Sequence, residues 1–197
     1  MSRLLYSATM SLDGFIAGPA GDMSWLTAHL AAPNPGAENL MDEIGALLVG
    51  RRTHTGDDPN AGTDEEGAFG GKWSGPVVVL SHDTAQFEPT PGISFVSDLE
   101  TAVAAAKGAA SGKYVNVLGA GVARSCIEAD LLDEIMVFVA PVMLGDGVRL
   151  FDHPGGGTVQ LERMERPQFT DATGMWFRVR RGQDPASNRA IPARTDG

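Results

Sequence analysis

Short apolar runs alternate with helix-like segments along most of this chain of 197 residues, and this alternation constrains its fold most strongly. Runs typical of buried strands span residues 4–10, 46–49, 76–80, 93–96, 113–118 and 134–142. Segments with helical spacing or a capping residue span 37–44, 99–110 and 119–129. Because strands that alternate with helices pair in parallel, we expect a central sheet flanked by helices.

The end of the chain follows a different pattern. Two strand-like runs, at about 159–165 and 175–181, have no helix between them and predict an antiparallel finish to the sheet. We therefore predict a single three-layer α/β domain over residues 1–181, with a mixed, mostly parallel central sheet flanked by helices. Residues 182–197 have almost no apolar content and are expected to form a flexible C-terminal tail.

Composition excludes several classes of function. The formal net charge of −10 and the sequence pI of about 4.7 argue against nucleic-acid binding. No stretch approaches the roughly 20 apolar residues of a membrane span. Cys126 is the only cysteine, which favours a reducing, cytoplasmic setting and a packing role for its thiol. The four histidines are scattered, so we expect no metal site.

Two arginines stand where a predicted strand ends. Gly50, Arg51, Arg52 and Thr53 follow the run 46–49 directly, and guanidinium groups bind phosphate well. Loops at the carboxyl ends of parallel strands form ligand crevices, so this segment is a candidate phosphate site. The alternative is that both arginines are solvated residues at the start of a helix.

Two further strand ends offer phosphate-binding groups. Gly119, Ala120, Gly121 and Val122 form a strand-to-helix turn whose free amides suit a pyrophosphate, although such a turn also needs glycine for steric reasons alone. Ser81 and His82 follow the run 76–80, where they either cap a turn or bind a phosphate. Together with Arg51, they would fit the 2′-phosphate of NADP, which favours NADPH over NADH.

A glycine-containing loop after the first strand ends at Trp25 and could act as a mobile lid over a hydride-transfer site. Within it, Asp22 and Asp13 are candidate acids for protonation or substrate binding, and Asp57 is a third. Asp22 ranks first because it stands beside Trp25 on the presumed lid. The alternatives are that Asp13 caps its own turn and that Trp25 belongs to the core.

Taken together, these segments resemble the dihydrofolate reductase-like superfamily, most closely the bacterial relatives of the reductase domain of riboflavin biosynthesis. The motifs occur in the family order: Ser-Leu-Asp-Gly from Ser11, Gly-Arg-x-Thr from Gly50, Leu-Ser at 80–81, the glycine turn at 119–122, and Ala-Pro-Val-Met-Leu-Gly from Ala140. The spacing of Thr53 and Asp-Asp-Pro at 57–59 is similar to the riboflavin-type pattern.

This resemblance implies an NADPH-dependent reductase that transfers hydride to a small heterocyclic substrate, which would be pyrimidine, ribosylaminopyrimidine or pterin-like. Arg51, Arg52, Thr53, Ser81 and His82 would face the cofactor phosphates, the turn 119–122 would cover the pyrophosphate, and Ala17 and Gly18 would border the nicotinamide. The resemblance also implies a homodimer, for which the 134–142 region is a candidate interface.

Leucines stand at two positions where the family carries acids, Leu30 and Leu118. One alternative is therefore a non-catalytic NADPH-binding or regulatory module. A second alternative, independent of these leucines, is a reductase that uses flavin or deazaflavin.

Overall fold

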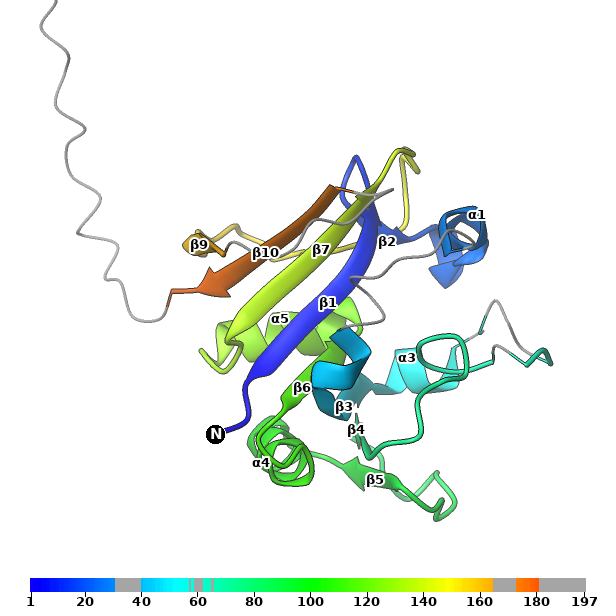
Figure 1. The fold of residues 1–197 in the computed structure, drawn as a ribbon, viewed down its shortest axis with the longest axis vertical. Coiled ribbons are helices and arrows are strands. Elements are labelled where there is room, and N and C mark those ends of the chain that lie inside the picture. Colours follow the sequence, from blue (N-terminus) through cyan, green and yellow to red (C-terminus); the bar gives the residue numbers. More distant parts are fainter. Residues whose placement is uncertain (31–39, 57, 59–61, 65, 165–172, 181–197) are drawn as a thin grey trace, which may run out of the picture.

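The structure is a computed structural model that describes residues 1–30, 40–56, 58, 62–64, 66–164 and 173–180. Its central feature is an eight-stranded sheet in the order β5-β4-β3-β6-β1-β7-β10-β9 (Figure 1). The strands are β1 (Leu4–Ser11), β3 (Ile44–Gly50), β4 (Val77–Leu80), β5 (Ile93–Val96), β6 (Tyr114–Leu118), β7 (Glu134–Ala140), β9 (Leu161–Met164) and β10 (Thr173–Val179). The first six strands of the order are parallel, whereas β10 pairs antiparallel with β7 and β9. The predicted mixed, mostly parallel sheet is confirmed.

The remaining elements are short, apart from two helices. The helices are α1 (Thr27–Leu30), α3 (Arg51–Thr55), α4 (Leu99–Ala109) and α5 (Ala120–Glu128), with 3-10 turns η1 (Pro19–Gly21) and η2 (Ser24–Leu26). Strands β2 (Phe15–Ala17) and β8 (Val148–Arg149) pair in a separate two-stranded sheet. Asp98 caps α4 as predicted, with its carboxylate 2.8 Å from the Thr101 amide.

The structure shifts some predicted boundaries. Ile44 opens β3 instead of closing the preceding helix, and β7 ends before Pro141, which has no N–H for a ladder. β7 also lies between β1 and β10 with both of its edges paired, so it offers no free edge to a partner subunit, and the suggestion that the 134–142 region forms a dimer interface stays a prediction. The proposed tail, residues 182–197, lies outside the described residues.

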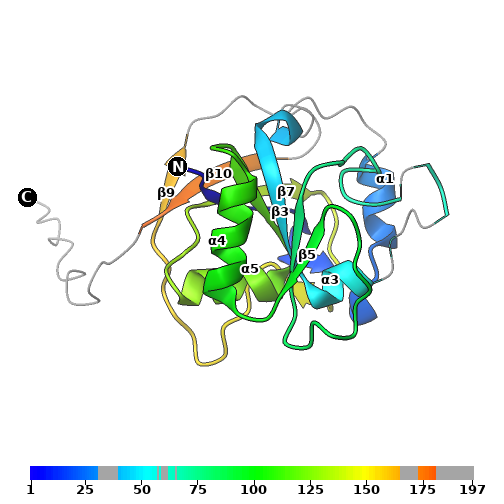
Figure 2. The ribbon, with the colours of Figure 1, turned by 90° about the horizontal axis from the view of Figure 1, so that it is seen from below.

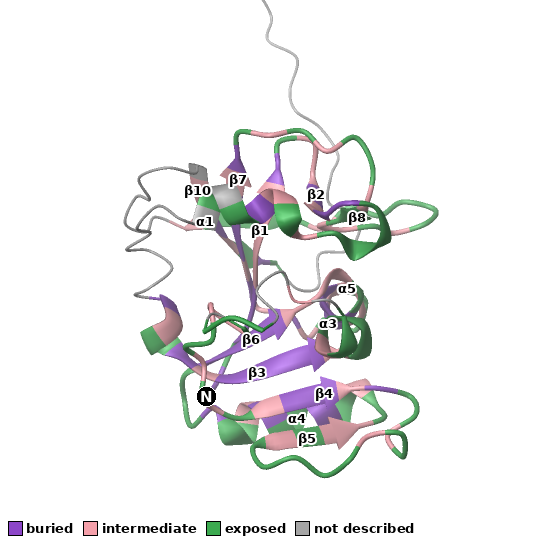
Figure 3. Ribbon diagram, turned by 90° about the vertical axis from the view of Figure 1, so that its right-hand side faces the viewer, coloured by how far each residue is buried: buried purple, intermediate pink, exposed green. Residues whose placement is uncertain are grey.

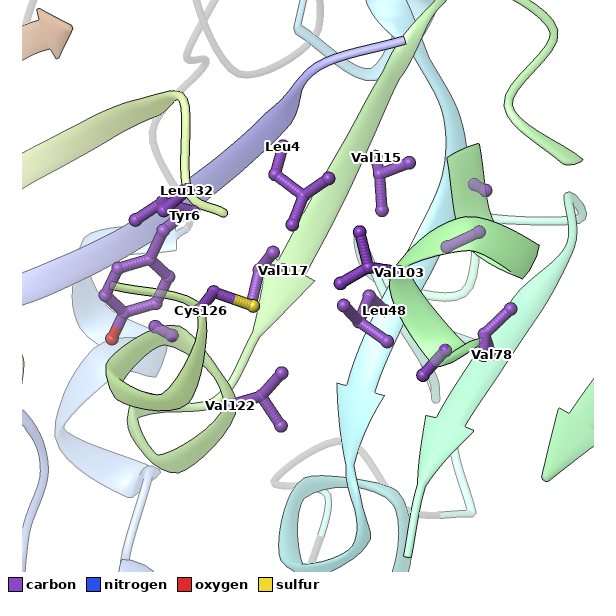
Figure 4. Packing of buried hydrophobic residues seen from close by; sticks show 14 of the residues in the cluster. Leu4, Tyr6, Leu48, Val78, Val103, Val115, Val117, Val122, Cys126 and Leu132 are labelled. Carbon is purple, nitrogen blue, oxygen red and sulfur yellow. The ribbon is translucent and has the colours of Figure 1, made fainter. Parts of the chain in front are cut away.

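Helices α4 and α5 cover one face of the sheet (Figure 2). Alternate residues of β1 and β6, such as Leu4, Tyr6, Val115 and Val117, pack there against the helices (Figure 4). Cys126 lies in this cluster with no exposed surface, and burial raises the pKa of its thiol to about 12. The packing role predicted for this cysteine therefore fits the structure.

The opposite face holds a second apolar cluster that includes Leu5, Leu47, Met136 and Phe138. The central strands are buried along most of their length, whereas edge strand β5 is partly exposed (Figure 3). This second face also carries the polar side chains of Ser7 and Asn116, discussed below.

A buried carboxylate ties the amino ends of several strands together. Glu134 is 1% exposed and accepts hydrogen bonds from Arg3 Nη1 at 2.6 Å, from the Tyr114 hydroxyl at 2.9 Å and from Trp176 Nε1 at 2.7 Å. These groups come from β6, β7, β10 and the residue preceding β1. The network lies at the edge of the sheet where the parallel strands begin.

Within the described ranges, no helix is long and apolar enough to cross a membrane. The same part of the chain brings together no group of three metal-ligating side chains.

Candidate functional site

The carboxyl ends of the parallel strands meet at one edge of the sheet. There β3, β4 and β6 give way to the segments that contain the predicted phosphate motifs, and β1 gives way to the loop predicted to act as a lid. Because these strands run side by side in the same direction, segments distant in sequence become neighbours at this edge. This is where open parallel sheets form ligand crevices.

The turns after β3 and β6 contact each other closely. A Cβ on Gly119, whose φ is +101°, would collide with the Thr53 hydroxyl, and a Cβ on Gly50 would lie 2.9 Å from Val122 Cγ2. A larger residue at either position would have to displace the side chain that it meets on the opposite turn. The structure thus brings together two of the motifs that the sequence suggested separately.

The first turn of α5 supplies backbone donors at this contact. Gly119 is the N-cap residue, and the first intrahelical bond to it comes from the Ala123 amide at 3.1 Å. The amides of Ala120, Gly121 and Val122 precede that bond and therefore have no acceptor within the helix. Such groups bind anions, because the helix dipole also favours negative charge at this end.

Arg51 and Arg52 open α3, whose exposed residues lie beside this contact (Figure 3). Among the described residues, neither guanidinium has a carboxylate within ion-pair distance. In a chain with a formal net charge of −10, two arginines at one strand end without an ion-pair partner in the described part of the chain create a local cationic surface. The residues present therefore fit the phosphates of a dinucleotide.

Ser81 and His82 follow β4 at the same edge. Ser81 is buried, and its hydroxyl donates to the Asp83 carbonyl at 2.9 Å, so that hydroxyl stabilises its own turn. The His82 side chain is exposed. Of the two, His82 has the side chain available for a phosphate, and the roles of both residues in cofactor binding stay predictions.

The Asp13 carboxylate fastens two loops together. It accepts from the Ser11 hydroxyl at 2.5 Å, and from the amides of Leu144 at 3.1 Å and Gly145 at 2.7 Å. These bonds, led by the one from Ser11, lower its pKa to about 2. Asp13 thus joins the loop after β1 to the loop after β7, and its suggested part in proton transfer stays a prediction.

Asp22 has a local structural role of the same kind. Its carboxylate accepts from the amide of Ser24 at 2.9 Å and from the Ser24 hydroxyl at 3.0 Å, and these bonds lower its pKa. Its own carbonyl accepts from the Gly18 amide at 2.7 Å and so closes the turn around η1. The catalytic role that we predicted for Asp22 is untested, and Asp57 lies outside the described residues.

Ala17 and Gly18 contact the segment that leads into β8. Both are buried, and a Cβ on Gly147 would overlap the Ala17 carbonyl oxygen. The β2–β8 pairing that creates this contact was not predicted, because strands of three and two residues carry no usable periodicity. Arg149 of β8 lies over the Phe15 ring, with its guanidinium carbon 4.5 Å from the ring centroid.

Two polar groups that lack partners among the described residues were not recognised from sequence. The Trp25 indole N–H and the Asn116 amide nitrogen are both buried and, within the described part of the chain, lack hydrogen-bond partners. For Asn116 a signal did exist, because it interrupts a run of apolar residues in a buried strand.

Comparison with known proteins identifies the family. The family model of the RibD C-terminal domain matches residues 3–172. The chain belongs to the RibD C-terminal domain family. This confirms the resemblance to riboflavin-type reductase domains that the motifs suggested. No curated protein matches this RibD-family chain in sequence.

Solved structures share the fold of this RibD-family chain. A protein from Shewanella sp. PV-4 named for riboflavin biosynthesis is 23% identical, with a TM-score of 0.66, over 92% of this chain and 100% of the other. A diaminohydroxyphosphoribosylaminopyrimidine deaminase/5-amino-6-(5-phosphoribosylamino)uracil reductase from Thermotoga maritima is 17% identical, with a TM-score of 0.62, over 90% of this chain and 56% of the other. Dihydrofolate reductase from Enterococcus faecalis, solved with NADP(H), is 12% identical, with a TM-score of 0.55, over 90% of this chain and 96% of the other.

Proposed function

We propose that this chain is an NADPH-dependent reductase that transfers hydride to a small pyrimidine-type heterocycle. The observation that carries the proposal is the contact between the Gly50–Thr53 and Gly119–Val122 turns, the first of which holds two arginines without an ion-pair partner among the described residues. Membership of the RibD C-terminal domain family supports the same conclusion. So does the fold shared with a dihydrofolate reductase solved with NADP(H).

In this proposal the chain contributes binding and orientation. The first amides of α5 would hold the pyrophosphate, and Arg51 and Arg52, with His82, would hold the 2′-phosphate. NADPH, when bound, supplies the hydride. The loop that Asp13 fastens would shield the reacting atoms from water at the carboxyl edge.

The substrate class follows from the family and from one relative's name. The Thermotoga maritima protein is a 5-amino-6-(5-phosphoribosylamino)uracil reductase, and this chain spans about half of its length. We infer that the substrate is a ribosylaminopyrimidine or a related pyrimidine or pterin. Consumption of NADPH with 5-amino-6-(5-phosphoribosylamino)uracil or dihydrofolate would support turnover. Tight NADPH binding without any turnover would instead favour the non-catalytic module, and a coloured cofactor retained on purification would favour the flavin or deazaflavin alternative.

Arg51→Ala tests the cofactor assignment. Because a charged hydrogen bond to the 2′-phosphate exists only with NADPH, we expect NADPH binding to weaken by about 1–3 kcal/mol while NADH binding changes little. Fluorescence titration of the purified protein with each nucleotide measures both. Arg163→Ala, which removes an exposed arginine from β9, is the matched control. Equal weakening of both nucleotides in the Arg51 variant would reject the assignment.

We also infer a homodimer and a cytoplasmic setting. The homodimer rests on the family resemblance, and the setting rests on the single buried cysteine, which suits a reducing compartment. Both stay predictions.

A further inference from the structure

Ser7 of β1 and Asn116 of β6 form a polar pair on an otherwise apolar face of the sheet. The Ser7 hydroxyl donates to Asn116 Oδ1 at 2.8 Å, and Asn116 has no exposed surface. Its neighbours Val115 and Val117 point to the opposite face, where α4 and α5 pack. The pair therefore faces away from the two long helices.

One end of this buried amide is unsatisfied. Ser7 holds the oxygen, while Nδ2 has no hydrogen-bond partner among the residues that the structure describes. A buried donor without an acceptor destabilises a fold, so a position with a purely structural role would favour an apolar residue like those beside it. An acceptor that arrives with a ligand explains why asparagine stands here.

Asn116 lies in the middle of the strand that leads into the proposed cofactor site. Asn116 precedes Gly119 by three positions on the chain, which corresponds to about 10 Å along a strand. Toward the carboxyl edge this face is less closely covered, since Ser7, Thr9 and Leu118 are only half-buried, whereas Asn116 itself is buried. A hydride acceptor must lie about 3–3.5 Å from its donor, and the other face is covered by helices. The substrate of the proposed reductase would therefore rest on the face that carries the pair.

We propose that Asn116, oriented by Ser7, donates a hydrogen bond from Nδ2 to a ring carbonyl oxygen of a pyrimidine-type substrate. The inference rests on the proposed reductase function and adds to it the chemistry by which the ring is recognised. An amide N–H selects an acceptor, so a keto group is favoured over an amino group at the same ring position. Asn116 is then a specificity-determining residue and Ser7 is a positioning residue.

The test uses two ring probes that differ in the relevant groups. 5,6-Diaminouracil carries two ring carbonyls, whereas 2,4,5,6-tetraaminopyrimidine carries amino groups in their place. Calorimetric titration of the full-length, NADPH-saturated protein is expected to show about tenfold tighter binding of the uracil. Asn116→Leu is expected to reduce that preference to about twofold or less and to leave NADPH affinity unchanged. A retained preference in this variant, no preference in the wild type, or no binding of either probe would overturn the proposal.

Two further variants keep the test decisive. Ser7→Ala keeps the Asn116 amide but removes the hydroxyl that orients it, so this variant should lose part of the preference for 5,6-diaminouracil. It can be measured even if Asn116→Leu does not fold. An unchanged preference in Ser7→Ala would then count against the proposal. Ser2→Ala removes another serine hydroxyl bond, to the Lys107 carbonyl at 3.0 Å, and serves as the control that should leave the preference intact. Failure of the wild type to bind NADPH would refute the reductase function itself, an outcome distinct from loss of ring selectivity.

Discussion

At the scale of single residues, Asp13 shows how one carboxylate organises the edge that holds the candidate site. It joins Ser11 to the amides of Leu144 and Gly145, which lie more than a hundred residues further along the chain. These bonds lower its pKa from 3.8 to about 2, so the folded state binds a proton there less readily than the unfolded chain does. The carboxylate therefore stabilises the fold above the unfolded pKa and loses that contribution as the pH falls through the folded pKa.

Asp13→Asn should accordingly lower the melting temperature at neutral pH. We expect the gap from the wild type to stay constant above about pH 5 and to close between about pH 4 and pH 2, because the wild-type carboxyl is then protonated. Thermal unfolding followed by circular dichroism across this range measures the gap. Asp152→Asn, at an exposed position, is the control. A gap that persists unchanged at pH 2 would show that the ionised carboxylate is not its cause.

The sequence predicted the positions of the site segments better than the roles of their individual side chains. The Ser-Leu-Asp-Gly motif located Asp13, yet its bonds to residues 144 and 145 depend on tertiary contacts that no local pattern encodes. The Asp22 carboxylate accepts a hydrogen bond from the Ser24 amide within its own turn. The sequence is compatible with this hydrogen bond but does not predict it. Asn116 belongs to no motif, and only its polarity within a buried strand distinguishes it.

At the scale of elements, the contact between the turns after β3 and β6 depends on two glycines. Gly119→Ala would place a methyl group against the Thr53 hydroxyl in a backbone conformation that alanine disfavours. We expect a loss of about 1–3 kcal/mol in the free energy of unfolding and weaker NADPH binding. Urea denaturation and nucleotide titration measure the two effects.

Gly121→Ala is the matched control for folding, because no atom lies within 4 Å of the place that its methyl group would take and the residue is helical. Here helix propensity favours alanine, so stability should be unchanged or slightly higher. If both variants lost stability equally, the special role of the Gly119 backbone would be contradicted.

Elements were predicted well where periodicity or capping is strong. The parallel strands and helices α4 and α5 occur where the apolar runs and the Asp98 cap indicated. The two-stranded sheet of β2 and β8 escaped prediction, since its pairing joins short segments remote in sequence. A helix start at Arg51 and Arg52 was considered only as the alternative to a phosphate site. The five residues of α3 carry too little pattern to define a helix from sequence.

At the scale of the whole molecule, the buried Glu134 network holds the strands at the edge opposite the site. Glu134→Ala would remove the acceptor shared by Arg3, Tyr114 and Trp176, and we expect a loss of about 3 kcal/mol in the free energy of unfolding. Chemical denaturation measures this loss. Glu162→Ala breaks only exposed ion pairs of 3.8 Å and should cost less than about 1 kcal/mol. If Glu134→Ala and Glu162→Ala lost similar amounts of unfolding free energy, the conclusion that the Glu134 network stabilises the fold would be contradicted.

Because the strands from β5 to β7 all point the same way, the Glu134 network and the candidate binding site fall on opposite edges of the sheet. Replacements in the loops at the candidate edge leave the Glu134 network untouched, although Asp13 and Gly119 at that edge make contacts of their own that stabilise the fold. Replacements that change substrate choice can therefore be confined to the candidate edge while the Glu134 network stays intact. The same separation makes that edge the natural target for anyone redesigning selectivity.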